Sequence, residues 1–199
     1  MFGTCTMTKT VILGVIMAVA ILGGSIIAAD AAGVFSDIIK VNLNDGKKAL
    51  NSLQLKTGAK IPTGEILHGF GAITDGSATD AALVAIVTTS HPGVYDSEDQ
   101  TNADDPIWHN HVVALKGIDT SECASGLAVL DLTFESPGTT QVQSNHVGMN
   151  HIAYGAYTGQ LADTEIDSGD DVAAIVSFIL SGSTTPGNIC VTPVDFAAP

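Results

Sequence analysis

The chain has 199 residues, of which 21 are acidic and 7 are basic, and its formal net charge at pH 7 is −14. It contains no arginine. A chain so poor in positive charge lacks the basic surface that neutralises phosphates, so we expect neither a nucleic acid nor an anionic membrane surface as a partner. The negative charge favours solubility and attracts cations.

The first residues have the pattern of an export signal. The stretch between Lys9 and Asp30 is uncharged and mostly apolar, and it ends in small residues that form an A-x-A cleavage site, Ala29-Asp30-Ala31. We therefore expect a signal peptide at 1–31 and a single secreted or cell-surface domain at 32–199. The alternative is an uncleaved membrane anchor, because about 20 apolar residues suffice to span a bilayer.

A strand and a short helix are predicted at the start of this domain. Residues 34–43 are rich in Val, Ile and Leu and end at the turn signal Asn44-Asp45-Gly46. Asp45 is a suitable N-cap for a helix over 45–55, and Leu50 and Leu53 would share one side of it.

Beyond Pro62 the sequence consists of short apolar runs separated by Gly, Asp, Ser, Thr and Pro. The run at 81–89 is apolar at both odd and even positions, which predicts a strand covered on both faces. The expected strands are 65–73, 81–89, 107–115, 127–134, 141–144, 147–154, 171–180 and 189–194. In the fourth of these, alternation predicts a shared face for Ala128, Leu130, Leu132 and Phe134.

The predicted fold class is therefore all-β. Short strands with frequent turn signals are typical of an antiparallel β-sandwich, Ig-like or jelly-roll-like, here with one short N-terminal helix. Cys5 lies in the signal segment, which leaves Cys123 and Cys190 as the thiols of the mature chain. An even pair of cysteines in an exported protein predicts one disulfide between them.

The histidine pattern suggests a metal site. His109 and His111 are two residues apart, so on a strand both rings project from the same face. Two imidazoles so placed can share one copper or zinc ion. Ile107, Val113 and Leu115 have the same parity, so the alternative is a pair of histidines at the margin of the core.

Other histidines and an acidic segment could supply further metal ligands. His146 and His151 would converge only through a loop at Gly148, and His91 ends a strand at a turn. An acidic segment precedes the H-x-H pair and makes calcium a further possible cation, although a solvated loop is the simpler interpretation. Its carboxylates are Asp96, Glu98, Asp99, Asp104 and Asp105.

A secreted β-sandwich with an H-x-H strand, further histidines and one disulfide resembles the copper/zinc superoxide dismutases. The resemblance implies that His109 and His111 are metal ligands and that His146 or His151 completes the site. The chain departs from that family in lacking a recognisable His-rich zinc loop and any arginine to guide superoxide. Separately, the four residues Val34-Phe35-Ser36-Asp37 resemble the start of TasA-type secreted filament subunits.

We therefore expect a secreted domain that binds copper or zinc through a histidine cluster. The alternative is a structural extracellular module, such as a filament, cell-surface or adhesive subunit, with self-association or a cell-surface partner. The sequence has no nucleophile elbow, Walker loop, dinucleotide fingerprint or HExxH helix, so we expect no catalysis or, failing that, a metal-dependent redox reaction. Carbohydrate binding is disfavoured because the chain has one Trp and three Tyr for stacking on sugars.

Overall fold

The computed structural model describes residues 35–62, 67–90, 107–185 and 187–199. This part of the chain is almost entirely β-structure, and its strands pair antiparallel. In chain order the strands are β1 Ile38–Gly46, β2 Ala49–Thr57, β3 His68–Thr74, β4 Ser77–Ala78, β5 Leu83–Ser90, β6 His109–Gly117, β7 Leu127–Leu132, β8 Thr139–Gln143, β9 His146–Ala153, β10 Ala156–Thr158, β11 Glu165–Asp167, β12 Val172–Gly182 and β13 Ile189–Ala197. The predicted all-β, antiparallel fold class is confirmed.

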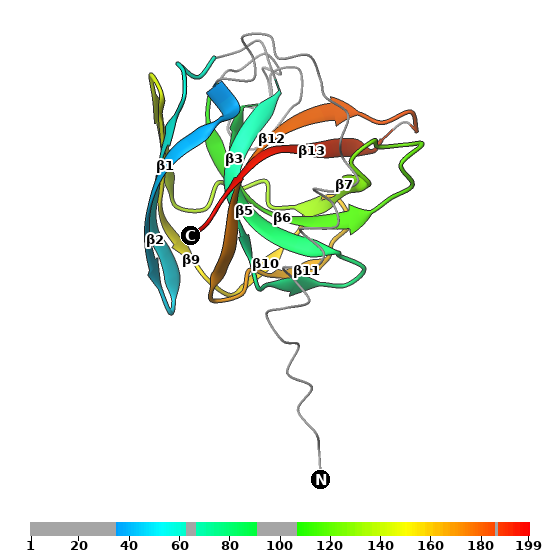
Figure 1. Ribbon diagram of the computed structural model, residues 1–199. Helices are drawn as coiled ribbons and strands as arrows, with labels where there is room; N and C mark the ends of the chain where they lie inside the picture. Colours follow the sequence, from blue (N-terminus) through cyan, green and yellow to red (C-terminus); the bar gives the residue numbers. More distant parts are fainter. Residues whose placement is uncertain (1–34, 63–66, 91–106, 186) are drawn as a thin grey trace.

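The strands form two layers (Figure 1). One layer is a four-stranded sheet in the order β1-β2-β9-β8, and the other closes on itself as the barrel β12-β13-β7-β6-β5-β3. A small sheet, β10-β11-β4, lies at one end (Figure 1). The molecule is thus a sandwich in which the second layer is a closed barrel.

The main hydrophobic core fills the space between the two layers. It combines apolar side chains of the four-stranded sheet with side chains on the outer face of the barrel. The sheet contributes Leu50, Leu53, Leu55, Val147, Met149 and Ile152, and the barrel contributes Phe70, Ala72, Val84, Ile86, Val112, Ala114 and Ile175. A second cluster, which includes Ile73, Ala85, Val87, Val113, Val176 and Phe178, fills part of the barrel interior.

β5 shows why barrel strands are apolar on both faces. Val84 and Ile86 face the four-stranded sheet, whereas Ala85 and Val87 face the barrel interior. All four side chains are buried, as the unbroken apolar run predicted.

The predicted helix at 45–55 is wrong, because these residues end β1, turn, and form β2. The pairing of β1 with β2 shifts so that Asn44 faces Ser52 while Asp45 faces Leu50. Asn51 is therefore the extra residue of a β-bulge, which places Leu50 and Leu53 on the same buried face. Leu50 and Leu53 are three residues apart, a spacing that is also typical of one side of a helix, and the sequence pattern therefore predicts a helix here.

A second bulge overturns the predicted alternation in β7. Asp131 faces Ala114 and Val129 faces Leu115, so Leu130 is an additional residue in the ladder. As a result Leu130 packs against the interlayer core while Leu132 and Phe134 line the barrel interior. Ala128 lies instead beside the disulfide. The four residues do not share a face.

The predicted disulfide is confirmed: Cys123 and Cys190 are bonded and have their Cα atoms 5.4 Å apart. It lies where the barrel closes least tightly, because the described pairing between β7 and β13 is a single position, Ala128 with Cys190. The disulfide therefore holds β13 against the turn that leads into β7.

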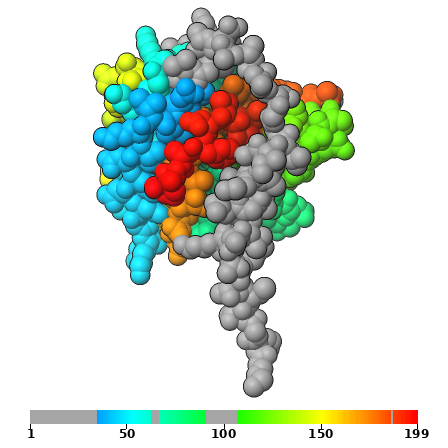
Figure 2. All heavy atoms as spheres, in the orientation of Figure 1, coloured from blue at the N-terminus to red at the C-terminus, as the bar shows by residue number. Residues whose placement is uncertain are grey.

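β13 also ties the two layers together. It runs beside β1 on the molecular surface, where β13 is red and β1 is blue (Figure 2). The backbone amide of Ile38 donates a hydrogen bond to the Asp195 carboxylate at 2.7 Å.

No helix in the ranges described is long and apolar enough to cross a membrane.

Candidate functional site

β6 carries His109 and His111 on the face that points into the barrel. His109 lies opposite Thr89 of β5, and His111 lies opposite Val87, a member of the interior cluster. Both histidines are buried, with 2 % and 3 % of their surface exposed. Their ring centroids are 4.7 Å apart and the rings are nearly perpendicular, at 83°. The same-side placement predicted from the H-x-H spacing is what the structure shows.

Backbone carbonyls fix the orientation of both rings. Nδ1 of His109 lies 3.0 Å from the carbonyl oxygen of Ile107, and Nδ1 of His111 lies 2.5 Å from that of Thr133. A carbonyl oxygen only accepts, so each Nδ1 carries the proton and donates it. In the neutral ring the lone pair that can bind a metal is then on Nε2.

Thr133 is itself held firmly, which makes it a rigid support for His111. Its backbone amide donates to the Val112 carbonyl at 3.0 Å, and its hydroxyl accepts the Val112 amide at 3.0 Å. These bonds continue the β6–β7 ladder past the end of β7. The position of the His111 ring is therefore determined by the sheet and not by an exposed loop.

The separation of the two rings suits a shared ion. A zinc ion about 2.0–2.1 Å from each ring nitrogen lies about 3 Å from each ring centre, so two ligand rings at a roughly tetrahedral angle have centroids about 5 Å apart. The observed separation of His109 and His111 is 4.7 Å.

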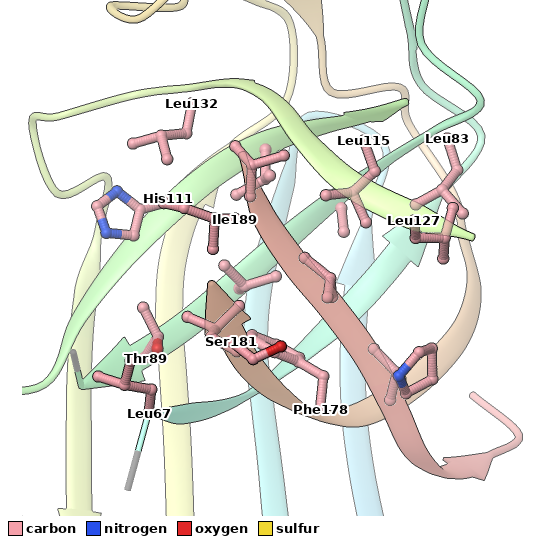
Figure 3. A pocket seen from close by; sticks show the side chains of 18 of the residues that line it. Leu67, Leu83, Thr89, His111, Leu115, Leu127, Leu132, Phe178, Ser181 and Ile189 are labelled. Atoms are coloured by element: carbon pink, nitrogen blue, oxygen red, sulfur yellow. The ribbon is translucent and has the colours of Figure 1, made fainter. Parts of the chain in front are cut away.

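His111 also forms part of the wall of a cavity inside the barrel. The cavity has a volume of about 310 Å³, and its other walls are almost entirely apolar. Figure 3 shows the His111 ring at one side of this space, with Leu132, Thr89 and Leu67 on the surrounding wall. The histidine pair and the apolar cavity are therefore adjacent.

His68 belongs to the interlayer core, beside Phe70 of the same strand. It is 1 % exposed, and its ring lies edge-on to the rings of Phe35 and Trp108 at centroid distances of 4.7 and 5.0 Å. Its backbone carbonyl accepts the Thr89 hydroxyl at 2.8 Å. His68 is thus linked to the barrel wall through its backbone, while its ring points into the core between the layers.

The structure does not bring the remaining described histidines to this pair. His146 and His151 both lie on β9 of the four-stranded sheet, and both are exposed. Within the ranges that the structure describes, no group of three or more His, Cys, Asp or Glu side chains is arranged to hold a metal ion. His91 and the acidic residues Asp96, Glu98, Asp99, Asp104 and Asp105 lie outside the described residues.

Asp131 is a buried polar residue whose role the sequence did not reveal. Its carboxylate accepts backbone amides from Leu132, Leu161 and Thr164 at 2.8–2.9 Å. Burial raises the pKa of Asp131, but these hydrogen bonds, which stabilise the ionised form, together bring the pKa below its ordinary value. The close approach requires Gly159, where an added Cβ would lie 2.1 Å from the carboxyl carbon.

The cavity was also missed, because its walls come from strands far apart in the sequence. The sequence does show that the barrel strands are apolar at both odd and even positions. This pattern indicates a second buried space, but it does not indicate that part of that space is empty.

Comparison of the chain with protein-family models, with curated proteins and with solved structures gives no match. The function of this chain must therefore be inferred from the geometry of the site.

Proposed function

We propose that this protein binds one transition-metal ion, copper or zinc, through the Nε2 atoms of His109 and His111. The observation that carries the proposal is the orientation of the two rings. Each donates Nδ1–H to a backbone carbonyl, which makes Nε2 the nitrogen through which the neutral ring can ligate a metal. Metal-binding histidines almost always make this second hydrogen bond, which fixes the tautomer and orients the ring.

The surroundings favour a transition metal over calcium. Imidazole nitrogen suits zinc and copper, whereas calcium takes oxygen ligands. Two histidines do not complete a tetrahedral site, so the remaining ligands must be supplied by water or by other residues. The ends of the segment 91–106 are held at Ser90 and Ile107, next to the pair, because Thr89 is paired with His109. His91 and the carboxylates of that segment are the first residues to test as additional ligands.

Titration calorimetry of metal-free protein with Zn²⁺ and Cu²⁺ tests the proposal. We expect one ion per chain in wild type and an affinity lower by about 100-fold or more when His109→Ala and His111→Ala are combined. The matched control combines His146→Ala with His151→Asn, since these histidines are exposed on β9 and Asn tolerates the positive φ of residue 151. This control should bind as wild type does.

Two further measurements do not depend on the folding of the double variant. Electron paramagnetic resonance of Cu²⁺-loaded wild type should show coupling to imidazole nitrogen. Acidification should release the metal, because protons compete for the same Nε2 lone pairs. The proposal is wrong if wild type binds neither ion, if bound copper shows no nitrogen coupling, or if the folded double variant binds as tightly as wild type.

We also propose that the protein is exported and works outside the cytoplasm. The uncharged apolar segment before Asp30 supports this, and so does the disulfide, since stable disulfides form mainly in oxidising compartments. The described fold begins at Phe35 and Ser36, which are both buried. A signal segment removed before residue 35 would therefore leave the described contacts of the domain intact.

A further inference from the structure

We propose that the barrel interior is a second binding site, which takes one uncharged apolar molecule of about the size of two fused rings. This site goes beyond metal binding and does not require it. The strands β3, β5, β6, β7, β12 and β13 all contribute to its wall. Figure 3 shows their side chains converging on a common space, with Phe178 on one side and Leu115 and Leu132 on the opposite side.

The size of the cavity sets the size of the ligand. An engineered apolar cavity of about 150 Å³ stays dry and binds benzene. The barrel cavity has about 310 Å³, roughly twice that volume. It is also at the lower end of the range of about 300–1,000 Å³ found for small-molecule sites. A two-ring hydrocarbon is therefore a suitable probe.

The wall chemistry determines the charge of the ligand. Of the described residues that line the cavity, none is Lys, Arg, Asp or Glu, and the polar ones are Thr89, His111 and Ser181. The Thr89 hydroxyl is already used in a hydrogen bond to the His68 carbonyl. In the metal-free cavity a carboxylate would lose its hydration with no lysine or arginine of the described wall to pair with, which is costly. The net charge of −14 further disfavours anions such as fatty acids.

The cavity reaches the surface, so a ligand has a route into it. Ser181 and Gly182, at the end of β12, line the cavity and are exposed. Leu161 also lines it and has 53 % of its surface exposed, an unusual position for a large apolar side chain. The backbone amide of Leu161 is held by Asp131, which keeps this residue at the opening. An apolar ligand would cover Leu161 as well as the buried wall.

A pair of probes that differ in charge alone provides the first test. Full mature protein is treated with a chelator, so that bound metal plays no part, and is titrated with naphthalene and with 2-naphthoate while its amide NMR spectrum is recorded. We expect saturable 1:1 binding of naphthalene, with shifts in β5, β6 and β12, and no binding of 2-naphthoate at the same concentrations. No saturable naphthalene binding, or equal binding of the two probes, would overturn the proposal.

Variants that fill the cavity provide the second test. Ala85→Phe and Val176→Phe each place a ring in the space, and each should weaken naphthalene binding by about tenfold or more, because a ligand needs most of its surface covered. Val194→Phe makes the same change on β13 at a position that is 42 % exposed and outside the cavity wall, and should leave binding unchanged. If either filled variant folds and binds naphthalene as wild type does, the ligand lies elsewhere. Because the probe comparison uses wild type alone, it decides the matter even if both filled variants misfold.

Discussion

Asp131 is buried with its carboxylate surrounded by backbone amides, and it connects β7 to the loop that carries Leu161 and Thr164. We predict that Asp131→Asn lowers the free energy of unfolding at pH 7 by about 1.5–3 kcal/mol, because an amide group places N–H donors against N–H donors. Asp163→Asn is the matched control. It lies exposed in the same loop, and its stability should stay within about 0.5 kcal/mol of wild type.

The same residue makes stability depend on pH. Burial opposes ionisation, but the amide hydrogen bonds outweigh it, so the folded-state pKa of Asp131 lies below its ordinary value. Its contribution is present above the pKa of the unfolded chain and is lost as the pH falls from about 4 through the folded pKa. Denaturant unfolding between pH 7 and pH 2 should therefore show the gap between wild type and Asp131→Asn narrowing below about pH 4. A gap that stays constant would exclude this role for the carboxylate.

At the scale of elements, the barrel is least well paired between β7 and β13, where the disulfide lies. We predict that replacing Cys123 and Cys190 together by Ser lowers the free energy of unfolding by about 2–5 kcal/mol. The loss should be localised, because β3 and β5 share seven paired positions and β7 and β13 share one. Amide hydrogen exchange should accelerate in β13 more than in β3. Equal acceleration in both strands would mean that the disulfide does not hold this particular junction.

The elements also show which features of the fold the sequence could predict. The strand periodicity predicts the correct faces where the ladder is regular, as in β5 and at His109 and His111. It predicts the wrong structure or face at the two bulges, near Asn51 and Leu130, because one extra residue moves the side chains that follow it to the opposite face of the strand. Bulges depend on the partner strand, so a single strand's sequence does not reveal them.

At the scale of the whole molecule, one candidate site is predictable from the sequence and the other is not. The H-x-H pair was predictable because its geometry is local to one strand. The cavity was not, since it depends on the closure of β12 and β13 against β7 and β3, and strand order is not encoded in any one segment. The hydrogen bond from His111 to the carbonyl of Thr133 is not predictable either, because the two residues are 22 positions apart in the sequence.

The whole chain, finally, is predicted to be longer than the working protein. The apolar segment ends in Ala29-Asp30-Ala31, so we expect the mature N-terminus between residues 29 and 34. Cleavage there would spare Ser36, whose carbonyl accepts the Ser177 hydroxyl at 2.7 Å, and Phe35, which packs on His68. Intact-mass measurement of protein from the culture medium or the cell envelope should give a chain that begins in this interval, with the disulfide formed. A full-length chain recovered with the membrane would identify the segment as a retained anchor.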